Sequence, residues 1–117
     1  MKRFLPLGLA ALALAVAVPA SAMSAKKLQG TVGPGFTITL KSGGKKVKTL
    51  KAGKYTITVS DKSDIHNFHL KGPGLNKQIT SVAFQGTKSY TATLKKGKYT
   101  FVCDPHASIM KGSFIVK

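Results

Sequence analysis

One cysteine, two histidines and one methionine are the residues of this sequence best suited to chemistry. Cys103, His106 and Met110 fall within eight residues of one another, and His66 stands upstream in the run Asp-Ile-His-Asn-Phe. They offer a thiolate, two neutral ring nitrogens and a weak sulfur donor, a set that favours copper over metals that prefer oxygen ligands. We therefore predict a trigonal site of two histidines and the cysteine, with the methionine as axial ligand, that holds one copper ion per chain.

Two other interpretations of these residues are weaker. Zinc also binds Cys and His, but structural zinc sites more often show paired Cys or Cys/His clusters and no thioether. A Cys-His nucleophile pair needs a base at the thiol and an oxyanion hole, whereas Cys103 lies on an apolar strand pattern with no glycine-rich helix start after it. We expect a metal-binding protein and not an enzyme.

The beginning of the chain has the composition of an export signal. Two basic residues precede the apolar stretch Phe4–Val18, and Ala20-Ser21-Ala22 supplies the small residues that a signal peptidase requires. The stretch is shorter than the roughly 20 apolar residues that cross a bilayer. We expect residues 1–22 to be cleaved, no transmembrane segment to remain, and residues 23–117 to form one domain in the periplasm or outside the cell.

The single cysteine supports a metal site in an exported domain. Cys103 has no second cysteine with which to form an internal disulfide, so its thiol must be buried, paired between chains or occupied by a metal. In an oxidising compartment an exposed thiolate would be oxidised unless something covered it, and a bound copper ion does so.

The expected mature chain is strongly basic. Of 19 basic residues two lie in the signal, so 17 lysines face three aspartates and the formal charge is +14. Such a field speeds encounter with acidic partners and weakens with salt. Nucleic acid is disfavoured because the lysines are scattered, arginine is missing after the signal and export would separate the two. We expect a monomer with an acidic partner protein, the alternative being an anionic envelope surface.

The sequence pattern predicts an all-β fold. Period-2 alternation of β-branched and aromatic residues indicates strands at 36–40, 55–59, 89–94, 99–103 and 113–116. Glycine- and proline-rich turns separate these segments, and no part of the mature chain keeps a helical apolar period for long. Short antiparallel strands at this spacing predict a Greek-key β-sandwich or barrel in a single domain.

One internal similarity suggests how the ligands are delivered. Leu50–Val59 and Leu94–Cys103 share Leu, Lys, Gly, Lys, Tyr and Thr at the same offsets. Each segment is predicted to be a corner followed by a strand, in which the glycine permits the turn and the tyrosine anchors it. Cys103 then enters the core at a strand end, and His66 follows the equivalent end of the first copy. The two ligand segments meet if these strands are parallel or lie in facing sheets.

The mature domain resembles the cupredoxins, the small blue copper proteins that include plastocyanin, pseudoazurin, amicyanin and azurin. The resemblance rests on His66-Asn67, on the run from Tyr99 to His106, and on Met110-Lys-Gly112. It implies a cupredoxin-type β-sandwich in which His66, Cys103 and His106 bind copper in a plane and Met110 lies above it. It also implies that Asn67 ties the two ligand loops together by hydrogen bonds.

The resemblance implies a carrier of single electrons between exported or membrane-bound redox partners, with transfer through the edge of His106. The alternative is a copper carrier or buffer that uses the same ligands. The loop departs from the plastocyanin pattern, because three residues separate His106 from Met110, one fewer than in plastocyanin and one more than in amicyanin. His69 should point away from His66, since side chains alternate along a strand, and we expect it to be a hydrogen-bonded histidine outside the site.

Overall fold

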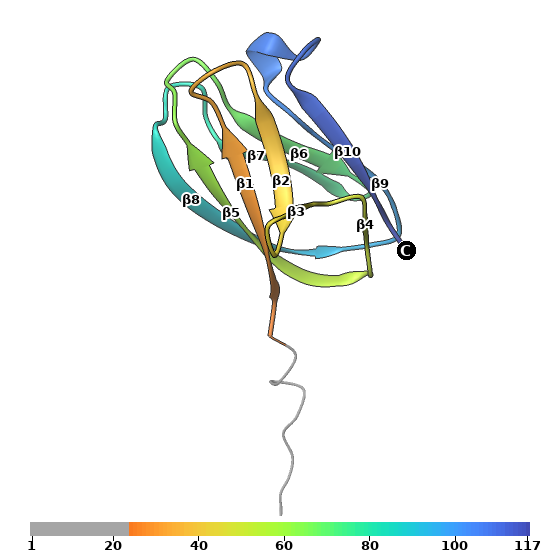
Figure 1. The fold of residues 1–117 in the computed structure, drawn as a ribbon. Coiled ribbons are helices and arrows are strands. Elements are labelled where there is room, and N and C mark those ends of the chain that lie inside the picture. The colour runs from red at the N-terminus through yellow and green to blue at the C-terminus, as the bar shows by residue number, and fades with distance from the viewer. Residues whose placement is uncertain (1–23) are drawn as a thin grey trace, which may run out of the picture.

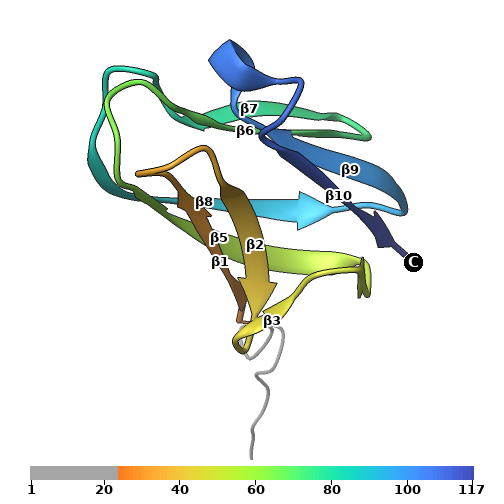
Figure 2. The ribbon, with the colours of Figure 1, turned by 45° about the horizontal axis from the view of Figure 1, so that its top comes forward.

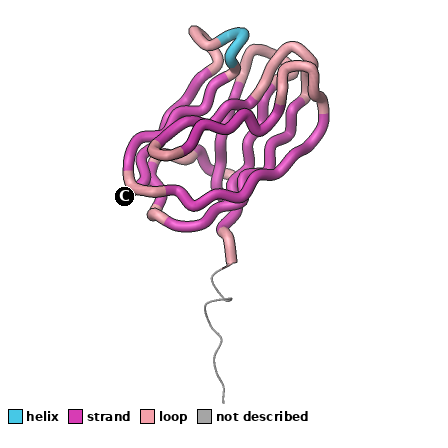
Figure 3. Tube along the Cα trace, turned by 180° about the vertical axis from the view of Figure 1, so that it is seen from behind, coloured by secondary structure: helices cyan, strands magenta, loops and turns pink. Residues whose placement is uncertain are grey.

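The computed structural model describes residues 24–117, so the predicted export signal lies outside the described residues. Strands dominate this part of the chain, as Figure 3 shows, and its one helical segment is the 3₁₀ turn η2 (Asp104–His106). No helix here is long and apolar enough to cross a membrane. The strands are β1 (Lys26–Val32), β2 (Ile38–Ser42), β3 (Lys45–Lys46), β4 (Thr49–Leu50), β5 (Gly53–Asp61), β6 (Phe68–Gly72), β7 (Leu75–Thr80), β8 (Gly86–Leu94), β9 (Gly97–Val102) and β10 (Lys111–Val116).

Two five-stranded sheets face each other, which confirms the predicted β-sandwich (Figure 2). The first sheet has the order β3-β2-β1-β5-β8 and the second has the order β4-β10-β9-β6-β7. The chain crosses repeatedly from one sheet to the other, so strands that are distant in sequence become neighbours (Figure 1). The loop that contains η2 lies at one end of the sandwich, beyond the end of β9.

The prediction of antiparallel pairing is wrong for two strand pairs. β1 runs parallel to β5 over its whole length, and β10 runs parallel to β4. β2 pairs antiparallel with one edge of β1, and the chain then passes through β3 and β4 before β5 adds to the other edge. A parallel neighbour requires such a crossover connection, which a pattern of alternation does not reveal.

Alternate strand residues fill the space between the sheets with aliphatic and aromatic side chains. Phe68 stacks on Phe101 with ring centroids 5.7 Å apart, and Tyr99 stacks on Phe114 at 5.3 Å. These rings and their aliphatic neighbours leave the interior nearly free of charge. The fully buried hydrophobic residues with no exposed area are Val32, Ile57, Val59, Phe68, Leu70, Leu94, Tyr99, Cys103 and Met110.

The sequence pattern missed β1, β3, β4, β6 and β7, and packing explains why β1 and β7 were missed. In β1 the inward position between Leu28 and Val32 is Gly30, and the Phe68 ring fills the space where its side chain would be, 2.9 Å from an added Cβ. β7 is an edge strand whose only buried residues are Ile79 and Thr80, so its sequence reads as polar. Such complementary packing is invisible in a single segment.

The two predicted corners form as equivalent structures in facing sheets. The Tyr55 hydroxyl donates to the Lys51 carbonyl oxygen at 2.8 Å, and the Tyr99 hydroxyl donates to the Lys95 carbonyl oxygen at 3.0 Å. Gly53 and Gly97 begin the strands with positive φ angles of 154° and 139°. The strands β5 and β9 that follow belong to different sheets, as one of the two predicted arrangements required.

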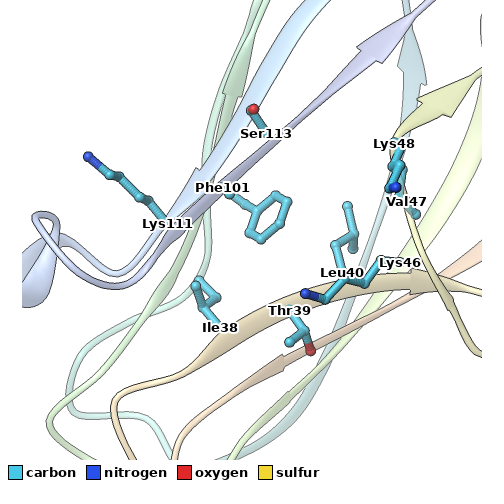
Figure 4. Close-up of a pocket in the computed structure, with 10 residues that line it drawn as sticks. Ile38, Thr39, Leu40, Lys46, Val47, Lys48, Phe101, Lys111 and Ser113 are labelled. Carbon is cyan, nitrogen blue, oxygen red and sulfur yellow. The ribbon is translucent and has the colours of Figure 1, made fainter.

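A groove of about 230 Å³ lies where β2 of one sheet faces β10 of the other (Figure 4). Leu40 and Phe101 contribute apolar lining, and three lysines, Lys46, Lys48 and Lys111, stand around it. None of the four predicted copper ligands lines this groove. The candidate site therefore lies elsewhere.

Candidate metal centre

Strand pairing brings the two predicted ligand segments to one end of the sandwich. β6 runs antiparallel to β9, with His69 opposite Val102. His66 lies just before β6, and Cys103 comes directly after β9, so both residues lie at the same end of this antiparallel strand pair. The pairing of β6 with β9 therefore brings His66 and Cys103 together although they are far apart in the sequence.

The loop from Cys103 to Met110 is closed by its own backbone hydrogen bonds. Pro105 fits the first turn of η2, where a missing N–H costs nothing. The Met110 N–H donates to the His106 carbonyl oxygen at 2.8 Å, and the Cys103 N–H donates to the Met110 carbonyl oxygen at 3.0 Å. Three predicted ligands are thus held on one rigid loop.

Three donor atoms converge. The Cys103 Sγ lies 3.6 Å from Nδ1 of His66 and 3.6 Å from Nδ1 of His106, and the two Nδ1 atoms are 3.2 Å apart. A metal with bonds of about 2.0–2.3 Å spans donor pairs at such separations when its bond angles are roughly 100–115°. Cys103 and His66 are fully buried, and His106 is partly exposed. The donor set therefore fits a soft metal ion in type, spacing and access.

Met110 is fully buried and ends the same loop. Its role as the axial ligand stays a prediction, and the three-residue spacing after His106 differs from that of plastocyanin.

Asn67 joins the two ligand segments, as predicted. Its Oδ1 accepts from the Asp104 N–H at 2.7 Å, and its Nδ2 donates to Oδ2 of Asp104 and to Oε1 of Gln78, each at 2.8 Å. Asn67 is fully buried next to His66, and Asp104 is next to Cys103. One side chain therefore fixes the loop of the first histidine against the loop of the cysteine.

His69 lies outside the donor cluster, as alternation along the strand predicts. Its Nδ1 lies 2.8 Å from Oδ2 of Asp104, and its Nε2 contacts Oδ1 of Asn76.

Partial burial raises the pKa of Asp104, but the hydrogen bonds from Asn67 and His69 outweigh it and leave that pKa below its ordinary value. The second carboxylate near the site, Asp61, shows the opposite result: burial raises its pKa more than its polar neighbours lower it.

A sequence model of the family described as "Cupredoxin-like domain" matches residues 8–116 of the chain. This chain belongs to the cupredoxin-like family. Auracyanin A, a "blue" copper protein from the green thermophilic photosynthetic bacterium Chloroflexus aurantiacus, has a similar structure, with a TM-score of 0.56 and 21% identity over 80% of this chain and 100% of that one. Reduced rusticyanin gives a TM-score of 0.51 and 24% identity over 80% and 81%. No curated protein matches the sequence.

The structure adds site residues of this cupredoxin-like chain that the sequence did not indicate. The ring of Phe36 packs edge-on against His66 and His106, with centroids 5.4 Å and 4.9 Å away. The pattern had assigned Phe36 to a strand, but the turn that begins at Gly33 extends through it and β2 starts two residues later. Gln78 reaches Asn67 from β7, and Asp61 is buried at the end of β5; neither carries a motif that would have revealed it.

Proposed function

We propose that this chain is a type 1 copper protein that carries single electrons and is not an enzyme. The observation that carries the proposal is the convergence of one thiol sulfur and two imidazole Nδ1 atoms within 3.6 Å around a fully buried cysteine. His66, Cys103 and His106 would hold the ion, and Met110 would be the axial ligand. Auracyanin A and rusticyanin, whose folds this chain shares, are both named as copper proteins.

Bound copper would supply a one-electron couple. The contribution of the protein is a rigid donor set, because the closed loop and Asn67 hold the ligands in place whether or not charge on the ion changes. The burial of Cys103 keeps water and other reactants from the sulfur, which favours electron transfer over a nucleophilic role.

The exposed edge of His106 is the proposed route for the electron. Three of the four large hydrophobic residues that are exposed in the described part of the chain, Phe36, Ile65 and Ile109, contact or immediately flank the candidate ligands. An apolar patch around a partly exposed ligand suits brief docking of a redox partner. The surrounding excess of lysine would steer an acidic partner toward it.

We further propose that residues 1–22 are removed on export and that residues 23–117 act as a monomer in the periplasm or outside the cell. The support is the charged start, apolar stretch and Ala-Ser-Ala site of the sequence. N-terminal sequencing of the exported protein would test this cleavage position.

The deciding experiment is the visible absorption and EPR spectrum of the purified domain with Cu(II), after treatment with an oxidant. An intense charge-transfer band with narrow copper hyperfine splitting is expected for the wild type, and both should vanish in Cys103→Ser. His69→Ala is the matched control for His66→Ala, since of these two histidines only His66 lies beside the Cys103 sulfur. A pale spectrum that is insensitive to Cys103→Ser would overturn the proposal, and ready loss of Cu(I) to a chelator with poor redox cycling would favour copper buffering instead.

A further inference from the structure

Two buried polar atoms beside the candidate site have no hydrogen-bond partner among the described residues. They are Oδ2 of Asp61 and Nε2 of His66. Asp61 is 2% exposed and His66 is fully buried, so bulk water does not reach either group. Buried polar groups in folded proteins are nearly always paired, and each exception requires an explanation.

The two atoms are chemically complementary. His66 presents Nδ1 to the sulfur of Cys103 and to Nδ1 of His106. A neutral histidine that uses Nδ1 as a ligand carries its hydrogen on Nε2, which is then a donor only. An ionised aspartate is an acceptor only. One orphan atom needs an acceptor, and the other needs a donor.

The chain just after Asp61 lies close to the His66 ring. Oδ1 of Asp61 accepts from the Ser63 N–H at 3.2 Å. A Cβ built on Gly33 would lie 3.1 Å from both the Ser63 Cβ and the His66 Cδ2, the ring atom bonded to Nε2. Gly33 is therefore next to both the start of the β5–β6 loop and this edge of the ring. Burial raises the pKa of Asp61, while the Thr80 hydroxyl, the Ser63 N–H and, least of these, the charge of His66 lower it. Thr80 is thus a second neighbour of the carboxylate, which can accept more than one hydrogen bond.

We propose that Asp61 is a positioning residue for His66. Because the two atoms make no direct hydrogen bond, one buried water molecule accepts the hydrogen of Nε2 and donates to Oδ2. This pairing fixes the ring and leaves Nδ1 unprotonated and facing the sulfur. The Nε2–H tautomer of His66 is a property of the metal-free chain, whereas its effect on copper binding rests on the proposed function. A carboxylate on the far nitrogen orients an imidazole ligand and makes it a stronger base.

The first test is nitrogen NMR of the metal-free protein with labelled histidine. The Nε2–H tautomer of His66 is expected in the wild type, with His106 donating from its Nδ1 across the 3.2 Å contact. Asp61→Ala should populate the other tautomer or broaden the signal. A wild-type His66 that carries its hydrogen on Nδ1, or an identical His66 spectrum in Asp61→Ala, would overturn the inference without any reference to copper.

The second test measures copper affinity and reduction potential. Asp61→Ala should weaken Cu(II) binding by about 10- to 100-fold, the range found when partners of metal-bound histidines are removed. Asp61→Asn keeps an oxygen acceptor but loses the charge. It should therefore bind Cu(II) more tightly than Asp61→Ala, while its reduction potential stays above that of the wild type. Asp64→Ala removes the same charge from the exposed loop that follows β5, and it should match the wild type.

These measurements separate failure of the inference from failure of the proposed function. A wild type that binds no copper would remove the proposed function, and the tautomer would still decide the role of Asp61. A blue wild type with Asp61 variants that all match Asp64→Ala would leave the function intact and overturn the inference. If Asp61→Ala does not fold, Asp61→Asn and the wild-type tautomer carry the test.

Discussion

The candidate ligands differ in their access to solvent. Cys103 and His66 are fully buried, whereas His106 is partly exposed beneath the ring of Phe36. Phe36 is 56% exposed, yet its ring packs in T-shaped contacts against the imidazoles of both His66 and His106. Its role is to cover the site and not to stabilise the core, because most of its surface remains in water after folding.

Phe36→Ala should therefore open the site with little effect on the fold. Edge-to-face aromatic contacts contribute about 0.5–1.5 kcal/mol, so copper should transfer to a chelator up to about tenfold faster. The free energy of unfolding of the metal-free protein should change by less than about 1 kcal/mol. Ile65→Ala is the control. Ile65 is comparably exposed at 49%, but it has no aromatic ring with which to pack on the imidazoles as Phe36 does. Equal transfer rates in the two variants would contradict this role.

Asp104 should make the stability of the metal-free protein depend on pH. Its folded pKa lies below the ordinary value of 3.8, because the hydrogen bonds from Asn67 and His69 outweigh the effect of burial. The stabilisation is fully present above the unfolded pKa and is lost as the pH falls through the lower, folded pKa. Denaturant titration should show Asp104→Asn to be less stable than wild type by about 1 kcal/mol at pH 7, a small value because the carboxylate is half-exposed. The difference should close as the pH falls below 3.8 and through the lower, folded pKa, and a constant difference would contradict the assignment.

At the scale of elements, the two corner-and-strand units are the parts that position the site. One corner leads into β5 and the other leads into β9, and the ligand segments follow the far ends of these strands. The units differ in one contact. The Tyr99 hydroxyl both donates to the Lys95 carbonyl and accepts from the Lys95 N–H at 2.9 Å, while the Tyr55 hydroxyl only donates.

Removal of each hydroxyl should reveal this difference. Tyr99→Phe leaves a donor and an acceptor without their partner and should cost about 2 kcal/mol of unfolding free energy, against about 1 kcal/mol for Tyr55→Phe. Thermal or denaturant unfolding of both variants in the copper-free state measures the two costs side by side. If Tyr55→Phe proves equally or more damaging, the second hydrogen bond at Tyr99 contributes nothing.

At the scale of the whole molecule, charge and apolar surface are separated. The lysines lie in turns and on outward strand positions, including those around the groove between β2 and β10, whereas Phe36 and Ile109 mark the end near His106 as apolar. Under the proposed function, such a positive field around an apolar contact patch would attract an acidic partner over long range, and the patch itself would bind it only weakly.

Salt should therefore change the rate of electron exchange in a direction set by the charge of the reactant. The Debye screening length falls from ~30 Å at 0.01 M to ~8 Å at 0.15 M ionic strength. Stopped-flow oxidation by an anionic metal complex should slow over that range, and oxidation by a cationic complex should become faster. Rates that are independent of ionic strength for both complexes would show that the net charge of +14 does not act at the transfer site.

The sequence by itself determined the chemistry and the class of fold. Cys103 and His106 share one short loop with Met110, so the approach of the sulfur to the His106 ring needs only local turns. Alternation in strands such as β5 matches the burial of their side chains. Tertiary structure decided the rest: the parallel pairing of β1 with β5, the cover provided by Phe36, and the hydrogen bond from Asn67 to Gln78. These depend on segments that meet only when two sheets close on each other, and no local pattern records which distant side chain fills a neighbour's space.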